Sequence, residues 1–282
     1  MAPRIAFQGD LGSYSHQACA AALPDHDPLP CTTFEDALAA VRDRRADRGM
    51  IAIENSTYGR VADVHRLLPD SGLHIVGEAF VRVRIALMAN EGSRLEDIRR
   101  VRAHLVLIPQ ARAFLDAHGI AAEAAADSAG AAAALAAAPQ RGQGVLASSL
   151  AARIHGLDVL AEGIEDMAHN TTRFIVMARE PRAPAPGSGP VKTTFVFRVR
   201  NIPAALYKAM GGFATNGVNM TKLESYMVDG RFSATQFYAD IEGHPDDPPV
   251  ARALEELGYF TDRLAVLGVY PADPEHFDGG HD

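Results

Sequence analysis

The chain has 282 residues, of which 48% are hydrophobic and 22% are charged, and its formal net charge is -8 at pH 7. This composition is typical of a globular protein, and the length favours two domains. The acidic balance argues against nucleic acid as a partner. No apolar run has the length of a membrane span, and no signal-peptide core follows Met1. Only Cys19 and Cys31 are present, too few for a disulfide framework, so we expect a cytoplasmic protein with reduced thiols.

Strand-like and helix-like segments alternate in the region before residue 181. Strands are predicted at residues 5–7, 50–53, 73–88, 121–125, 145–146 and 174–177. Helices are predicted from about residue 14 and at residues 34–44, 61–68, 129–138 and 149–154. Strands that alternate with helices indicate parallel sheets covered by helices, so the predicted fold class is α/β.

A segment rich in proline and glycine, residues 181–190, interrupts this pattern and is interpreted as an interdomain linker. The elements predicted after it form a β-α-β-β-α-β series at residues 192–199, 204–214, 218–226, 232–241, 250–257 and 264–270. This series is typical of the ferredoxin-like α+β arrangement. The predicted domains are therefore residues 1–180 and 191–273, with a tail at 274–282. An exposed sheet edge in the second domain favours a homodimer or a dimer of dimers.

Short polar clusters stand where predicted strands pass into helices, where ligands of α/β sheets usually bind. Residues 9–17 follow the first strand, and Ser13 or Ser15 either contributes to a site or simply caps the helix. Residues 53–57 follow the second strand, where Glu54 acts as a general acid or base or only orients Asn55.

Two further clusters come later in the chain. Ser128 lies in a segment that, taken alone, is an ordinary helix cap. Residues 170–174 contain Arg173, a fixed cation suited to carboxylates. Alternatively, Arg173 forms a structural ion pair with Glu165 or Asp166. The four clusters together indicate a small anionic ligand.

These clusters resemble, in order and spacing, the motifs of the prephenate dehydratase family. The resemblance rests on Gly12–Ala18, Ile53–Ser56, Ala147-Ser148, Gly156-Leu157 and Asn170–Phe174. The region after the linker resembles the ACT domain of that family at residues 201–207, 219–225 and 240–244. The similarity is to the monofunctional form, without a chorismate mutase segment.

The resemblance implies a catalytic region of two α/β lobes, similar in architecture to periplasmic binding proteins, with the site in the cleft between them. The first lobe would combine residues 1–78 with 166–178, and the second would span residues 79–163. The implied reaction is the decarboxylative dehydration of prephenate to phenylpyruvate, a step of L-phenylalanine biosynthesis. This carbon–oxygen lyase chemistry implies neither a metal ion nor an organic cofactor.

The resemblance also implies roles for individual residues. Thr172 would donate a hydrogen bond to the leaving hydroxyl, while Asn55 and Gln110 would hold the substrate. Glu54 would accompany Asn55 in a catalytic pair, and Arg173 would balance the substrate carboxylates. Further expected substrate-binding residues are Ser13, Ser15, Ser56, Ser128, Thr171 and Phe174. The nearby histidines, His16 and His104, are expected to cap or pack rather than catalyse.

The ACT resemblance implies L-phenylalanine as an effector that regulates the enzyme. The expected effector-binding residues are Ala205, Leu206, Asn219, Met220, Thr221, Leu223, Glu224 and Ser225. Two departures stand out: Ala103 replaces a serine of the family, and Tyr226-Met227 replaces an Arg-Pro pair at the effector site. The second departure predicts weaker regulation. Two alternative functions remain open, an arogenate dehydratase and a ligand sensor without catalysis.

Overall fold

The computed structural model describes residues 2–167, 169–200, 202–227 and 234–274. Position 201, the start of the predicted strand 232–241 and most of the predicted tail lie outside these ranges. The chain forms two compact units, the first from residues 1–61 and 79–174 and the second from residues 62–78 and 175–282. None of the helices in the described ranges is both long and apolar enough to cross a membrane.

The first unit contains a sheet built around the N-terminal strand. Its strands are β1 (Arg4–Gln8), β2 (Asp27–Cys31), β3 (Arg48–Asn55) and β11 (Thr171–Ala178), in the order β11-β3-β1-β2. Strand β1 pairs in parallel with both neighbours, and the short β4 (Gly59–Arg60) turns back along the end of β3. Helices α1 (Tyr14–Ala22) and α2 (Phe34–Arg42) pack against this sheet. Pro28 and Pro30 lack a backbone N–H, which suits β2 to its place at the sheet edge.

A second sheet in the same unit has the order β10-β6-β9-β7-β8. Its strands are β6 (Ala86–Ala89), β7 (Arg100–His104), β8 (Ala121–Ala125), β9 (Gln143–Ala147) and β10 (Asp158–Glu162). Its helices are α4 (Arg112–His118), α5 (Ser128–Ala137) and α6 (Ser149–His155).

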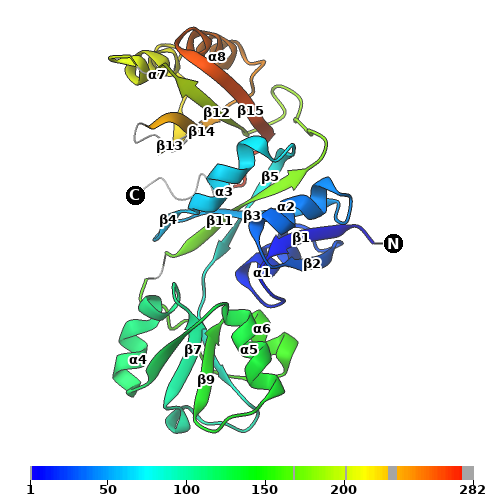
Figure 1. Ribbon diagram of the computed structural model, residues 1–282, viewed down its shortest axis with the longest axis vertical. Coiled ribbons are helices and arrows are strands. Elements are labelled where there is room, and N and C mark those ends of the chain that lie inside the picture. Colours follow the sequence, from blue (N-terminus) through cyan, green and yellow to red (C-terminus); the bar gives the residue numbers. More distant parts are fainter. Residues whose placement is uncertain (1, 168, 201, 228–233, 275–282) are drawn as a thin grey trace. The chain divides into compact units, whose positions relative to one another are not determined.

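Successive residues of the second sheet belong to different hydrophobic clusters. Leu87 packs in a cluster with Leu115 of α4, whereas Met88 packs in another with Leu135 of α5. Because side chains alternate across a strand, these clusters lie on opposite faces of the sheet. Figure 1 shows α4 on one side of β7 and β9, and α5 and α6 on the other. Helices therefore cover both faces, as the alternating sequence pattern predicts.

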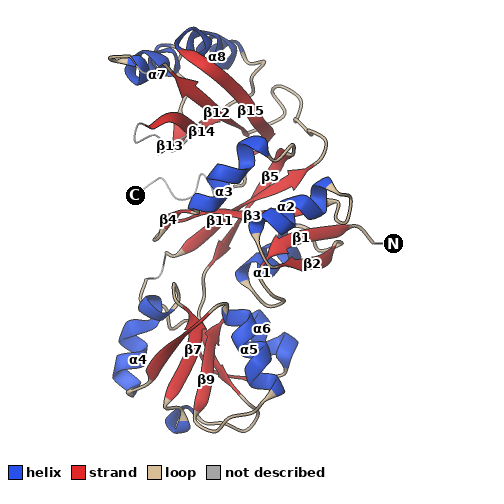
Figure 2. Cartoon of the chain, in the orientation of Figure 1, coloured by secondary structure: helices blue, strands red, loops and turns tan. Residues whose placement is uncertain are grey.

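Two strands, β5 (His74–Arg82) and β11, each pass from one unit into the other. The remaining elements of the second unit begin with α3 (Ala62–Leu67) and the 3-10 turn η1 (Leu68–Asp70). After the linker come β12 (Val191–Val199), α7 (Ala205–Thr215), β13 (Met220–Met227), β14 (Ala234–Glu242), α8 (Pro248–Phe260) and β15 (Thr261–Pro271). Figure 2 shows this alternation of helices and strands.

The four strands after the linker pair antiparallel in the order β13-β14-β12-β15. Phe195 and Phe197 of β12 belong to one core with Phe213 of α7 and Leu257 of α8. Both helices therefore cover the same face of the sheet. The predicted β-α-β-β-α-β arrangement is confirmed, as is the α/β class of the preceding region.

A buried ion pair connects β5 and β12 within the second unit. Lys192 Nζ lies 3.0 Å from Glu78 Oε2, and both side chains are almost completely buried. Glu78 Oε1 accepts a further hydrogen bond from the backbone N–H of Asp273. Such a pair is stable only when each charge keeps its partner.

One predicted strand, residues 73–88, proves to be two strands, β5 and β6. Between them the backbone N–H of Val83 donates to Asn170 O, and that of Ile85 donates to the carboxylate of Glu165. These bonds replace ladder hydrogen bonds and direct the chain from one sheet to the other. Apolar residues continue to alternate through residues 83–85, so the sequence pattern did not reveal the break between β5 and β6.

Candidate functional site

A cavity of about 400 Å³ lies within the first unit, at the ends of several strands. Both of that unit's sheets contribute to it. Its lining includes Ser13, Ser15, Asn55, Tyr58, Arg60, His104, Asp127, Ser128, Ser148, Thr172 and Phe174. These residues come from segments that the sequence places far apart, and they lie at strand ends, in the loops after strands or at helix starts.

Three helices begin at this cavity. Their capping side chains accept hydrogen bonds from backbone N–H groups of the first turn: Ser13 from His16, Asp127 from Gly130, and Ser148 from Ala151. The N-termini of α1, α5 and α6 therefore direct their positive dipole ends toward the same region. This arrangement favours an anionic ligand.

Gly12 allows the starts of α1 and α6 to approach one another closely. Its φ is +96°, and an added Cβ would lie 2.7 Å from Ala151 Cα. The hydroxyl of Ser148 donates to the Gly12 carbonyl at 2.5 Å. A side chain at position 12 would therefore strain the backbone and push apart two helix starts that line the cavity.

Asn55 has a fixed orientation at the end of β3. Its Oδ1 accepts hydrogen bonds from the backbone N–H groups of Thr57 and Tyr58, at 2.9 and 3.0 Å. Its Nδ2 consequently faces Thr172 Oγ1 at 3.0 Å and Asn170 Oδ1 at 2.7 Å. Because the Thr172 oxygen accepts this bond, its own hydroxyl proton is available to a ligand in the cavity.

Gln110 is buried and lies behind the cavity wall instead of lining it. Its Nε2 donates to Val106 O at 2.7 Å, and its Oε1 accepts from Asn170 Nδ2. Asn170 therefore joins the two predicted substrate-holding residues, Asn55 and Gln110. The sequence motif contained Asn170, but nothing in its spacing indicated this role.

Glu54 and Arg173 form an ion pair at 2.7 Å, with side chains 26% and 6% exposed. Neither residue lines the cavity. Arg173 lies between Thr172 and Phe174 on β11, so its side chain points to the opposite face of that strand. The predicted alternative partners of Arg173 have other roles. Glu165 and Asp166 accept bonds from the backbone N–H groups of Ile85 and Ala113.

Arg60 supplies the cavity with a cation that the sequence reasoning missed. It lies on β4, opposite Glu54 in the strand register. In the sequence, Arg60 follows the polar cluster at residues 53–57 after only a tyrosine and a glycine, and these three residues form no recognisable motif. The short hairpin that brings Arg60 back to the cavity has no hydrophobic pattern to reveal it.

The remaining predicted residues divide between the cavity and its support. Ser13, Ser15, Ser128 and Phe174 line the cavity, and Ser128 Oγ accepts from the backbone N–H of His104. Ser56 and Thr171 do not; Ser56 Oγ instead donates to His169 O and accepts from Thr171 N.

His16 stacks on Phe7, and its Nδ1 accepts a bond from the backbone N–H of Gly12. Burial lowers its pKa, which favours the neutral ring that this bond requires. His16 thus packs and supports the loop, as the sequence suggested.

Two carboxyl groups meet at the rim of the cavity. A Cβ added at Gly130 would lie 2.7 Å from Asp10 Oδ2 and 3.2 Å from Asp127 Oδ2. Desolvation raises the pKa of Asp10, the Asp127 carboxylate raises it further, and His155 partly opposes the increase. Asp10 is therefore more readily protonated than an isolated aspartate.

The predicted effector residues belong to the second unit. Ala205 and Leu206 start α7, directly after Ala204, whose φ of +60° is uncommon for a residue with a side chain. Asn219 precedes β13, which carries Met220, Thr221, Leu223, Glu224 and Ser225. Tyr226, the first residue of the Tyr226-Met227 departure, accepts a hydrogen bond from Gln236 Nε2 at 2.6 Å.

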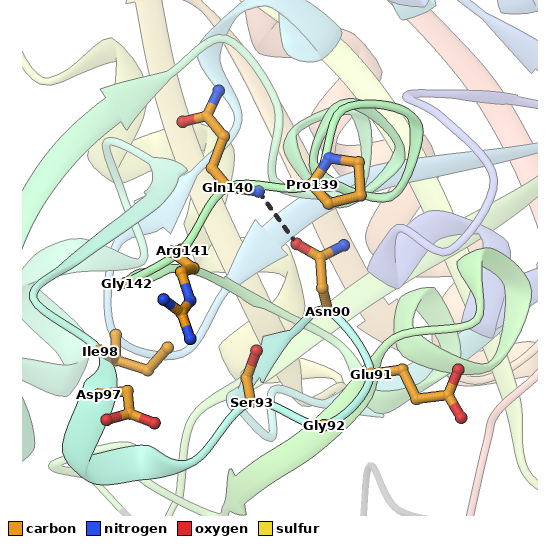
Figure 3. Close-up of a pocket in the computed structure, with 10 residues that line it drawn as sticks. All are labelled: Asn90, Glu91, Gly92, Ser93, Asp97, Ile98, Pro139, Gln140, Arg141 and Gly142. Atoms are coloured by element: carbon orange, nitrogen blue, oxygen red, sulfur yellow. Dashed lines mark hydrogen bonds between the residues drawn. The ribbon is translucent and has the colours of Figure 1, made fainter.

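A second hollow lies among loops of the second sheet, around Asn90 and Arg141 (Figure 3). Asn90 Oδ1 accepts a bond from Gln140 N at 3.3 Å there. None of the predicted site residues lines it. The polar groups singled out from the sequence gather instead around the cavity at the strand ends.

Comparison with known proteins identifies the family. The model of the prephenate dehydratase family matches residues 5–182. A bifunctional N-acyl-homoserine lactone acylase/prephenate dehydratase from Komagataeibacter europaeus is 51% identical over 96% of each chain. Arogenate dehydratase 2 from Petunia hybrida is 38% identical over 96% of this chain and 72% of its own.

A solved structure agrees with this result. Prephenate dehydratase from Arthrobacter aurescens, crystallised with L-Phe, superposes with a TM-score of 0.84 at 30% identity, covering 95% of this chain and 89% of its own. The match includes the elements after the linker as well as the region that contains the cavity. The chain belongs to the prephenate dehydratase family, whose members are hydro-lyases.

Proposed function

We propose that this chain converts prephenate to phenylpyruvate, with release of carbon dioxide and water. Prephenate carries two carboxylates and a ring hydroxyl, and losing one carboxylate together with the hydroxyl makes the ring aromatic. The obstacle is the departure of hydroxide, a poor leaving group. The observation that carries the proposal is the hydrogen bond from Asn55 Nδ2 to Thr172 Oγ1, which leaves the threonine proton for the departing oxygen.

In this proposal Thr172 donates to the leaving hydroxyl, and Asn55 increases the polarity of the donor by binding its oxygen. Arg60 and the three helix N-termini stabilise the substrate carboxylates. Arg173 does not contact the substrate in this proposal; its ion pair with Glu54 fixes the residue next to Asn55. Gln110 likewise acts through Asn170.

The proposal is tested by incubating the protein with prephenate and following phenylpyruvate formation. We expect turnover that is saturable and lost on heat denaturation. Tight binding of prephenate without any product would contradict the proposal and favour the ligand sensor.

Arogenate is a second possible substrate, because several relatives are named arogenate dehydratases. It differs from prephenate by an amino group in place of the side-chain keto oxygen. The cationic lining residue Arg60 favours prephenate, which lacks the ammonium charge. Parallel assays, with phenylalanine as the product from arogenate, give the ratio of kcat/KM for the two substrates.

A second function, hydrolysis of N-acyl-homoserine lactones, is favoured by the 51% identity to the bifunctional relative. The cavity has room for part of an acyl chain beside Val106, Leu107 and Phe174. Among its described lining residues, no serine hydroxyl is hydrogen-bonded to a histidine ring, so the resting site lacks a preformed Ser–His nucleophile. Release of free fatty acid from an N-acyl-homoserine lactone would establish this activity.

We further propose that L-phenylalanine binds the ACT-like part of the chain and inhibits turnover. The Arthrobacter aurescens relative was crystallised with L-Phe, which supports this ligand. No side chain caps α7 after the uncommon backbone at Ala204, and an uncapped helix start suits a carboxylate. Pairing of two copies through the edge strand β13 accompanies this proposal, since Leu223 and Met227 are 40% and 58% exposed there.

A further inference from the structure

Asn170 occupies a bridging position just before β11. The residue is 2% exposed, and both ends of its side-chain amide are hydrogen-bonded. Its Oδ1 accepts from Asn55 Nδ2 at 2.7 Å, and its Nδ2 donates to Gln110 Oε1. Its backbone oxygen accepts from Val83 N at 2.8 Å, so the residue is also held by the main chain.

The direction of each hydrogen bond around Asn170 is fixed by groups further away. Asn55 must present Nδ2, because two backbone N–H groups already hold its Oδ1. Gln110 must present Oε1, because its Nε2 donates to Val106 O. The side chain between them therefore has to accept on one side and donate on the other, as a neutral carboxamide does.

We infer that Asn170 is a positioning residue, which acts through Asn55 to hold the Thr172 hydroxyl as a donor toward the cavity. The inference rests on the proposed function. Without Oδ1 of Asn170, the Asn55 amide is still held through its own Oδ1, but its Nδ2 loses one of its two described partners. That end of the amide can then pivot about the anchored oxygen and lengthen the bond to Thr172. The donor would then lose its alignment with the leaving group, although every group that touches substrate would remain.

Asn170→Asp tests this inference, because the aspartate imitates the amide only when it is protonated. The neutral acid accepts from Asn55 and donates to Gln110. The ionised form has no donor and places its charge against Gln110 Oε1. Burial raises the pKa of a carboxyl group. We therefore expect kcat of the variant, divided by kcat of the wild type, to rise about 10- to 100-fold as the pH falls from about 8 to about 5.

Dividing kcat of the variant by kcat of the wild type cancels the pH dependence of ionisable groups that both proteins contain. The segments that meet at Asn170 carry these ionisable residues: Glu54, Arg82, Arg84, His104, Arg112, Asp166, His169 and Arg173. All of them are present in both proteins. A ratio that is flat with pH would overturn the inference.

Asn90→Asp provides a matched control. Asn90 also uses both ends of its amide, donating to Leu135 O at 3.1 Å and accepting from Gln140 N, but it lies outside the candidate site. Its ratio to the wild type should be flat over the same pH range. A parallel rise in the control would attribute the effect to general destabilisation and would also overturn the inference.

A double-mutant cycle covers the case in which the aspartate variant does not fold. Asn170→Ser should lower kcat about 10- to 100-fold in the wild type. In the Asn55→Ala background the same change should stay within about 3-fold, because the residue through which it acts is gone. Equal losses in both backgrounds would show a role independent of Asn55. Wild-type protein without turnover would instead refute the proposed function, so the two failures are distinguishable.

Discussion

Asn55 Nδ2 lies 3.0 Å from Thr172 Oγ1, and this bond assigns the threonine oxygen as acceptor and its proton as donor. Thr172→Ala should therefore lower kcat by about two to four orders of magnitude, the range for a lost proton donor. KM should change little, because the lost interaction strengthens in the transition state. Thr172→Ser keeps the hydroxyl and should retain much more activity. Near-normal kcat in the alanine variant would exclude the donor role.

Arg60 is expected to bind a carboxylate of the substrate. Arg60→Gln should raise KM for prephenate about 10- to 100-fold, since a hydrogen bond to a charged group contributes about 1.5–3 kcal/mol. Arg112→Gln is the matched control, because Arg112 forms an exposed pair with Asp116 outside the cavity. Steady-state kinetics of both variants would measure the two KM values. An unchanged KM in Arg60→Gln would show that Arg60 does not bind the substrate.

The carboxyl pair at the cavity rim predicts a dependence of stability on pH. The pKa of Asp10 is raised in the folded state, so its contribution to stability is complete below its ordinary value of 3.8 and is lost as the pH rises through the folded-state pKa. Asp10→Asn keeps a neutral donor beside Asp127 at every pH. Thermal unfolding should therefore give a higher Tm than the wild type at pH 7.5 and no gain at pH 3.5.

Asp25→Asn is the control for this measurement, because Asp25 is an exposed carboxylate on another loop. Its Tm should follow that of the wild type at both pH values. An Asp10→Asn gain that is equal at pH 3.5 and 7.5 would mean that ionisation is not its cause.

The buried Lys192–Glu78 pair predicts a large loss of stability on single substitution. Lys192→Met leaves the carboxylate of Glu78 buried without its cation, which costs about 3–5 kcal/mol. Adding Glu78→Gln removes the uncompensated charge and should recover part of this loss. Urea unfolding of the wild type, both single variants and the double variant measures the coupling. Additive effects would show that the two groups do not depend on one another.

Binding of L-phenylalanine is predicted to require β13. Titration calorimetry should detect binding to the full chain, and Thr221→Arg should abolish it by placing a long cation on the exposed strand. Thr215→Arg, at the exposed end of α7, is the control and should still bind. Inhibition that persists unchanged in Thr221→Arg would place the effector in the cavity instead.

Much of the fold was predictable because apolar periodicity survives in the sequence. The alternation in β12 and the helical pattern of α8 reflect one face packed on the core. Strand β2 escaped prediction because its two prolines obscure a strand signal. Strand β7 was also missed, because two arginines and a histidine interrupt its apolar pattern. Helix α4 was missed because it is only one short segment.

The candidate site was only partly predictable. A polar cluster after one strand and another at the entry to the last strand of the region indicated Asn55 and Thr172, which lie in hydrogen-bond contact. Their spacing did not show which face of β11 each residue occupies, and so Arg173 was expected beside the ligand. Arg60 and Asn170 depend on contacts between distant segments, which a single sequence does not encode in any local pattern.

The place of β11 also has a consequence for biosynthesis. It is the last strand of the first unit to be translated, yet it lies between β5 and β3 in the sheet order. Until this strand leaves the ribosome, its two neighbours present open edges that invite mispairing. The cavity gains Thr172 and Phe174 at the same moment. The cavity wall is therefore incomplete until residue 178 has emerged, and the edge of β5 that pairs with β15 stays open longer, until residue 271 has been made.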